Sequence, residues 1–165
     1  MKKIFILILI VSLGFSGCEK DDICDANTPT TPQLVIEFLI DEQNALAIPN
    51  KMKIQNADDS KELPFIAGSK IKLPLKTDKD LTRYIFTLNS DVTTIAKNAD
   101  NLEFNYTRNY VFISRACGYK TTFLIDTNKP ILIAETPLEN NWIKRIVVTK
   151  PNILNEDETH VKIYF

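Results

Sequence analysis

The sequence predicts an all-β protein, with an antiparallel β-sandwich of about eight or nine short strands as the expected architecture. Short segments rich in β-branched and aromatic residues recur along the chain at spacings of roughly ten to twenty residues. No amphipathic helix separates them, and parallel strands in one sheet need such crossover connections. These two observations favour the sandwich. A closed β-barrel is the alternative architecture.

Residues 1–17 are typical of a lipoprotein signal peptide. Two lysines precede an apolar run at 4–13, which is too short to span a hydrocarbon core of about 30 Å. Ser16 and Gly17, both small, then precede Cys18. We expect the sulfur of Cys18 to carry the lipid, with palmitate or a similar acyl group added, so that the mature chain is membrane-tethered and otherwise soluble. The alternative is an ordinary secretory signal followed by a coincidental cysteine.

The charged residues after Cys18 predict the destination of the protein. Lys20, Asp21 and Asp22 resemble the lysine-plus-acidic tag that follows the lipidated cysteine of surface-exposed lipoproteins in Bacteroidota. The resemblance implies export to the outer face of the outer membrane. The periplasmic face is the alternative, because a solvated tether has the same composition.

The mature chain is expected to form one domain. A proline- and threonine-rich stretch ends a lipidated tether at 18–32, and a single sandwich domain at 33–165 follows. Removal of the signal with its two lysines changes the net charge from −1 to about −3. A weakly acidic chain without a basic, aromatic-rich cluster is not expected to bind nucleic acid.

Cys24 and Cys117 are the two cysteines that remain beside Cys18. An even pair in an oxidising compartment predicts a disulfide, with two free thiols as the alternative. The bridge would pin Cys24 to the domain and leave six residues of tether after Cys18, a reach of about 20 Å. We therefore expect the domain to lie close to the membrane surface.

The strands are expected in the following order. Residues 34–40 place Leu34, Ile36 and alternate residues after them on one face, and 70–76 alternate lysine with apolar residues, with Pro74 indicating an edge or a bulge. A tight turn at Arg108 and Asn109 is expected between two of the later strands. The remaining strands are predicted at 83–88, 102–107, 110–114, 119–125, 142–149 and 161–165.

His160 is the only histidine in the chain, which leaves one candidate for histidine chemistry. We expect an exposed strand residue beside an acidic turn, and a metal ligand or base is the alternative. Asp58–Asp59 and Asp78–Asp80 are expected to be turns, because they lack the spacing of a calcium loop. Phosphate loops, nucleophile elbows and Cys–His pairs are missing from the sequence. No cofactor, no metal site and no catalytic residue is therefore predicted, and the protein is not expected to be an enzyme.

The segment 114–123 combines a cysteine with one of the two glycines of the mature chain. The favoured interpretation is a bulged or bent strand stapled at Cys117, with Gly118 allowing the bend. The alternative is a binding surface formed by Arg115, Tyr119 and Lys120. Exposed aromatic residues such as Tyr119 or Trp142, clustered in a groove, would favour glycan binding.

Several motifs together resemble a known family. The residues are Cys18-Glu19-Lys20-Asp21-Asp22-Ile23-Cys24, Thr28-Pro29-Thr30-Thr31-Pro32, Leu34-Val35-Ile36, Ser114-Arg115-Ala116-Cys117-Gly118-Tyr119-Lys120 and Asn141-Trp142-Ile143. They are similar to a family of small Bacteroidota lipoproteins of unknown function. The resemblance implies the lipid anchor and the cysteine pair, and it brings no known activity.

We therefore expect a lipid-anchored outer-membrane lipoprotein that binds without catalysis. Its partner would be the membrane, through the covalent lipid, together with an outer-membrane protein complex or an envelope glycan. One alternative is an envelope enzyme that acts on glycans through carboxylates. The other is a purely structural envelope component.

Overall fold

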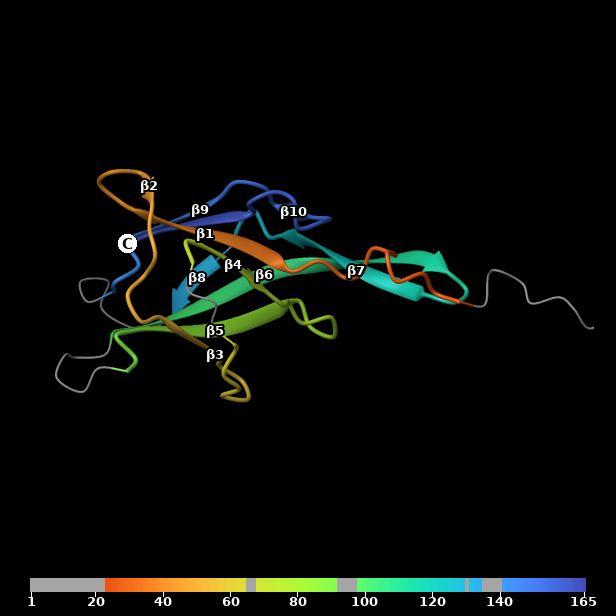
Figure 1. The fold of residues 1–165 in the computed structure, drawn as a ribbon, viewed down its shortest axis with the longest axis horizontal. Coiled ribbons are helices and arrows are strands. Elements are labelled where there is room, and N and C mark those ends of the chain that lie inside the picture. Colours follow the sequence, from red (N-terminus) through yellow and green to blue (C-terminus); the bar gives the residue numbers. More distant parts are fainter. Residues whose placement is uncertain (1–22, 65–67, 92–97, 130, 135–140) are drawn as a thin grey trace, which may run out of the picture.

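The computed structural model describes residues 23–64, 68–91, 98–129, 131–134 and 141–165. These residues form eleven β-strands in two sheets, and the sheets do not close into a barrel (Figure 1). The predicted sandwich is confirmed. Within the described part of the chain, no helix is long and apolar enough to cross a lipid bilayer. Cys18 and the expected export tag at Lys20, Asp21 and Asp22 lie outside the described residues.

The first sheet is built around β1, which has neighbours on both edges. β11 pairs with one edge in parallel register and is followed by β9, while β2 and β4 share the other edge. The parallel pair joins strands from opposite ends of the described chain, so the rest of the domain serves as the connection in place of a crossover helix. The strands are β1 (Leu34–Ile40), β2 (Ala45–Leu46), β4 (Lys70–Leu73), β9 (Arg145–Val148) and β11 (Val161–Tyr164).

The second sheet is built around β6, and its described pairs are antiparallel. β5 pairs with the first half of β6, residues 98–105, and β3 flanks β5. On the other edge of β6, β8 pairs with residues 101–104 and β7 pairs with residues 106–114. β10 pairs with the far edge of β7. The strands are β3 (Lys53–Asn56), β5 (Leu81–Leu88), β6 (Asn98–Ser114), β7 (Gly118–Ile125), β8 (Ile131–Ala134) and β10 (Asn152–Ile153).

The core lies between the inner faces of the two sheets. Alternate residues of β5 and β6 point inward and are almost fully buried, which is the pattern of sheets with one solvated face. The central strand β1 is buried on both faces, since Val35 and Leu39 are buried as well as Ile36 and Phe38. Edge-to-face ring pairs contribute to the packing across and within the sheets, with centroid distances of 6.5 Å for Phe38 and Phe86 and 6.3 Å for Tyr84 and Phe104. This part of the molecule, both sheets without residues 107–122, is called the body below.

Two of the expected element boundaries are wrong. The expected turn at Arg108 and Asn109 does not form, because both residues pair with β7 and β6 continues to Ser114. The ladder to a neighbouring strand outweighs a weak local turn preference. The expected strand at 142–149 is shortened to β9, because Trp142 and Ile143 pack into the core ahead of the ladder.

Candidate functional site

The second half of β6 and the start of β7 extend past the rest of the sheet as a two-stranded hairpin. We call residues 107–122 the arm. β5 pairs with β6 only as far as Asn105, and β10 reaches β7 only at Phe123 and Leu124. Figure 1 shows the arm projecting from the body, with the N-terminal part of the described chain running beside it. The eight residues that β6 contributes to the arm, 107–114, correspond to a length of roughly 25 Å.

The end of the arm is a bulged turn at residues 115–117. The backbone N–H of Cys117 donates to Ser114 Oγ at 3.0 Å, and the strand register shifts between Phe112 and Ser114. Gly118 has a φ of +70°, in the left-handed region that favours glycine. The sequence expectation of a bulge with Gly118 at the bend is confirmed, with the difference that the bend is a hairpin turn.

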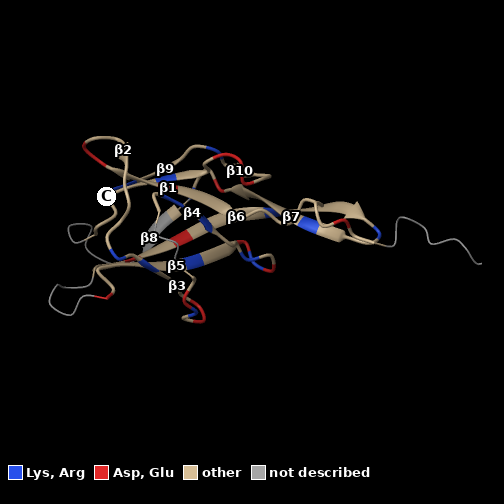
Figure 2. Ribbon diagram, viewed as in Figure 1, with Lys and Arg blue, Asp and Glu red and all other residues tan. Residues whose placement is uncertain are grey.

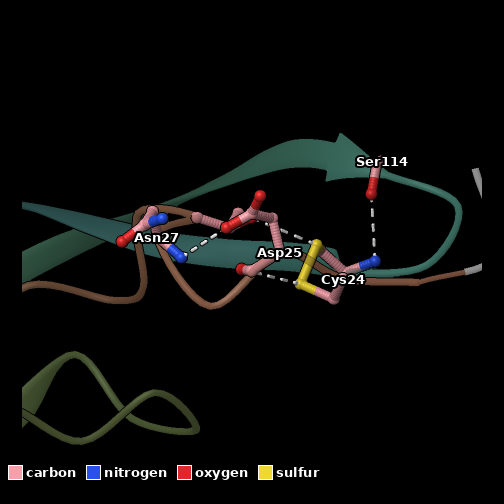
Figure 3. Close-up of a disulfide and its surroundings, with 6 residues drawn as sticks. Cys24, Asp25, Asn27 and Ser114 are labelled. Carbon is pink, nitrogen blue, oxygen red and sulfur yellow. Dashed lines mark hydrogen bonds between the residues drawn. A yellow bond between two sulfur atoms is a disulfide. The ribbon is translucent and has the colours of Figure 1, made fainter. Parts of the chain in front are cut away.

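Cys24 and Cys117 form a disulfide at this turn, with their Cα atoms 4.9 Å apart (Figure 3). The predicted pair is confirmed. The chain reverses just after Cys24, where Asp25 accepts two backbone hydrogen bonds, from Asn27 to Oδ1 at 2.8 Å and from Thr28 to its carbonyl oxygen at 2.9 Å. This side-chain turn directs the following residues back along the arm.

Residues 24–33 are held along the arm towards the body. The Thr121 N–H donates to Thr31 Oγ1 at 3.0 Å, and Pro32 is buried. At the body end, the Gln33 N–H donates to Glu156 Oε1 at 2.8 Å. From Cys24 onward, the segment expected as part of a tether is therefore attached to the folded domain.

The arm exposes an aromatic patch, which we define as Tyr110, Phe112 and Tyr119. Their side chains are 57%, 56% and 69% exposed, and the rings of Phe112 and Tyr119 meet edge to face with centroids 5.2 Å apart. Tyr110 and Phe112 share one face of β6, and Phe112 pairs across the ladder with Tyr119. Nearer the body, this same face carries Tyr106 and Phe123, which are buried.

Arg108 braces the base of the arm. Its Nε donates to Asp80 Oδ1 at 2.6 Å, and Nη1 donates to the Thr77 carbonyl at 2.7 Å and to the Tyr110 hydroxyl at 3.0 Å. The hydrogen bond to Asp80 raises the pKa of Arg108. The phenol of Tyr110 is thus held at its hydroxyl while its ring stays exposed.

The expected binding surface is only partly assembled. Arg115 lies in the turn of the arm and Tyr119 follows the disulfide, but Lys120 is the next residue in the strand and points to the opposite face. Tyr110 and Phe112 were missed because the expected turn at Arg108 and Asn109 interrupted the alternation that runs from Tyr106 to Phe112. A single long strand would have revealed them.

Trp142 does not belong to this surface, which corrects the expectation of an exposed aromatic residue. Its side chain is 7% exposed, its Nε1 donates to the Phe86 carbonyl at 3.1 Å, and its ring meets Phe165 at 5.9 Å. An indole buries a large apolar area once its single N–H has a partner, and the Phe86 carbonyl supplies one.

His160 is buried, which corrects the expectation of an exposed strand residue. Its ring atom Nδ1 accepts a hydrogen bond from the Val35 N–H at 2.9 Å. The backbone N–H of His160 donates to the Val35 carbonyl at 3.0 Å. Burial lowers the pKa of the imidazole. The side chain therefore links β1 to the start of β11 as a neutral acceptor.

Asp100 has a comparable structural role at the other side of the body. The side chain is buried on β6, and Oδ2 accepts the Ile143 N–H at 2.8 Å. Burial raises the pKa of this carboxyl. Among the described residues, no group of three or more histidine, cysteine or acidic side chains is placed to hold a metal ion.

A cleft of about 560 Å³ lies between β3 and β4, at the open edge of the sandwich. Its walls include the apolar side chains of Ile54, Leu63 and Ile71. The two lysines of β4 at its rim are ion-paired, with Nζ–O distances of 3.2 Å for Lys70 and Glu37 and 2.7 Å for Lys72 and Glu156. The bond to Lys72 lowers the pKa of Glu156. The cleft thus offers an apolar wall beneath neutralised charges.

The fold and the arm together define a small β-sandwich domain with a disulfide-closed hairpin. The chain belongs to the Family of unknown function (DUF6452), whose model matches residues 51–165. The matched residues include the whole arm with Cys117, whereas Cys24 and β1 precede them. Comparison with curated proteins and with solved structures gave no match. The expected membership of an uncharacterised family is confirmed at this level.

Proposed function

We propose that the protein is a lipid-anchored lipoprotein of the outer membrane, which presents its β-sandwich body to a partner and acts by binding rather than by catalysis. The observation that carries the proposal is the disulfide between Cys24 and Cys117 at the end of the arm. Cys18, the expected lipid attachment site, is six residues before Cys24. The anchor therefore attaches at the arm end, and the body faces away from it.

The disulfide changes the expected distance between the domain and the membrane. The six residues from Cys18 allow the end of the arm to move no more than about 20 Å from the anchor. The body begins only at the other end of the arm, roughly 25 Å further along the strands. The arm end is thus close to the membrane, while the body is held within reach of partners in the space beyond it.

The contacts of the buried polar groups support a binding role. His160 is committed to the backbone of Val35, and Asp100 to the backbone of Ile143. The lysines beside the cleft of the body are each engaged by a glutamate. Groups that are held this way stabilise the fold and do not have the freedom of an acid, a base or a nucleophile.

Metabolic labelling with a clickable fatty acid tests the anchor. We expect label on the native protein and none on the Cys18→Ser variant, with Cys24→Ser as a matched cysteine control that stays labelled. Label that persists in Cys18→Ser would overturn the proposal. Protease treatment of intact cells then distinguishes the outer face of the outer membrane, where the body is digested, from the periplasmic face.

A cross-linked pull-down of the tagged lipoprotein from its own outer membrane tests the binding role. A stoichiometric protein that comes along would make the chain an accessory subunit of that complex. Recovery of the intact lipoprotein alone, followed by saturable binding of an envelope glycan, would make it a standalone binder. Turnover of such a glycan by the purified protein would contradict the non-catalytic role.

A further inference from the structure

We propose that the aromatic patch of the arm, Tyr110, Phe112 and Tyr119, is a membrane-contact site that rests in the headgroup region of the bilayer. This inference depends on the proposed lipid anchor at Cys18. It adds a second, non-covalent contact between the protein and the membrane, made by side chains of the folded domain.

The distance along the chain brings the patch to the bilayer. Cys24 and Cys117 are joined, and Tyr119 is only two residues beyond Cys117, about 7 Å along the strand. The six residues from Cys18 to Cys24 have a reach of about 20 Å. An anchored molecule therefore keeps Tyr119 and its neighbour Phe112 within about 30 Å of the lipid attachment point, close enough to reach the bilayer.

The exposed side chains have the chemistry of the membrane interface. Tyrosine places an apolar ring beside a hydroxyl, and such residues are enriched at the level of lipid headgroups. The edge-to-face pair of Phe112 and Tyr119 forms one continuous apolar surface. Ile23, directly before the disulfide, is 82% exposed and adds an aliphatic side chain at the same end of the molecule.

The charged side chains near the end of the arm are of both signs. Residues 107–122 contain Arg108, Arg115 and Lys120 and no acidic residue. Arg108 is engaged by Asp80 at the base, whereas Arg115 and Lys120 lie near the end. Asp25 lies at the same end, next to Cys24, and Figure 2 shows both basic and acidic segments along the arm and the chain beside it. Membrane contact of the arm therefore depends on the aromatic side chains of the patch rather than on net charge.

The apolar residues exposed on the body provide a control. Leu46 in β2 is 59% exposed, comparable to the patch, but β2 belongs to the body and pairs with the far end of β1, at Leu39 and Ile40. Figure 1 shows β2 and the arm at opposite ends of the molecule. Leu46 and the aromatic patch are therefore similar in exposure and differ in their distance from the anchor.

The test couples the mature, non-acylated chain to vesicles through Cys18. With Cys24 and Cys117 oxidised, Cys18 is the one free thiol and reacts with a maleimide lipid, so the anchor is present whether or not cells acylate it. The vesicles contain phosphatidylethanolamine and phosphatidylglycerol. A photo-reactive benzoylphenylalanine replaces Tyr119 in one sample, Phe112 in a second and Leu46 in the control, and lipid adducts are counted by mass spectrometry.

We expect lipid adducts at positions 119 and 112 to exceed those at 46 by about ten-fold or more, because only the arm end stays at the interface. Equal yields at 119 and 46 would overturn the proposal, as would adducts at 119 to a second copy of the chain. The acylation assay with Cys18→Ser is separate, so failure of the anchor and failure of the patch give different results.

Discussion

The two halves of β6 have the same alternating pattern and opposite surroundings. In residues 98–105, Leu102 and Phe104 point inward and are buried beneath the first sheet, whereas Tyr110 and Phe112 continue the same face along the arm and are more than half exposed. β5 and β8 flank the first half, while β7 and the N-terminal segment accompany the second. The comparison shows that a facing layer, rather than the pattern of the strand itself, decides whether alternate residues form a core.

The two regions also depend on different stabilising interactions. The body buries a continuous set of apolar side chains between two sheets, which is the dominant favourable contribution to folding. A two-stranded ribbon on its own is marginally stable in water. The arm compensates with covalent and polar restraints, namely the disulfide at its end and the contact between Thr31 and Thr121 along its length.

The largest expected difference in the free energy of unfolding is between alanine variants of Phe104 and Phe112, two phenylalanines on one face of the same strand. Phe104→Ala should lower the free energy of unfolding by about 3 to 5 kcal/mol, because it leaves a cavity in the core. Phe112→Ala should cost less than about 1 kcal/mol, because its ring is mostly in solvent already. Urea denaturation of the oxidised protein measures both. Similar costs at the two positions would show that the arm is packed against something in solution.

The disulfide is expected to have the next largest effect, and mostly on the arm. Changing both cysteines together, Cys24→Ser with Cys117→Ser, should lower the free energy of unfolding by roughly 2 to 4 kcal/mol, since it releases a closure over a sequence separation of 93 residues. The double variant leaves no unpaired thiol of this pair. Thermal unfolding measures the global loss, and limited proteolysis should cut within 25–32 before the body opens.

A matched control locates that effect. Ser114→Ala removes the hydroxyl that accepts the Cys117 N–H and leaves the disulfide in place, so it should cost only about 1 kcal/mol. In the Ser114→Ala variant, residues 24–33 should remain resistant to protease. If the double cysteine variant unfolded at the parent temperature with the segment still protected, the disulfide would not be what holds residues 24–33 on the arm.

The sequence located the main strands of the body, although it missed β2, β3, β8 and β10, and it did not reveal the arm. Alternation at 34–40 and 83–88 locates core strands, because burial between two sheets selects for a period of two. The cysteine pair was predicted from the even number of cysteines left beside Cys18 and from an expected oxidising compartment. The arm could not be inferred, because where the facing sheet ends depends on the lengths of strands distant in sequence. His160 was misplaced for a similar reason, since its partner Val35 lies on a strand 125 residues away.

A smaller effect than those of Phe104 and the disulfide is expected from a histidine, which the body has and the arm does not. Burial lowers the pKa of His160, so the folded state keeps the imidazole neutral while the unfolded chain takes up a proton near pH 6.5. The unfolded state thus binds more protons as the pH falls below that value. Stability is therefore fully present above about pH 7 and decreases below it, by at most about 1.4 kcal/mol per pH unit.

The variant His160→Asn tests this origin, because an asparagine carbonyl can accept the Val35 N–H without titrating. We expect it to be less stable than the parent at pH 7.5, owing to lost packing, but to vary little between pH 7.5 and 5.5, whereas the parent should lose stability over that range. Glu156 and Glu158 oppose the lowered pKa of His160 and Lys70 supports it. The hydrogen bond to Lys72 lowers the pKa of Glu156, away from this range, so a flat curve for the variant assigns the slope to the histidine. Protease resistance of residues 25–32 should not follow the same curve, since a disulfide does not titrate, and a parallel loss there would show that the arm unfolds together with the body.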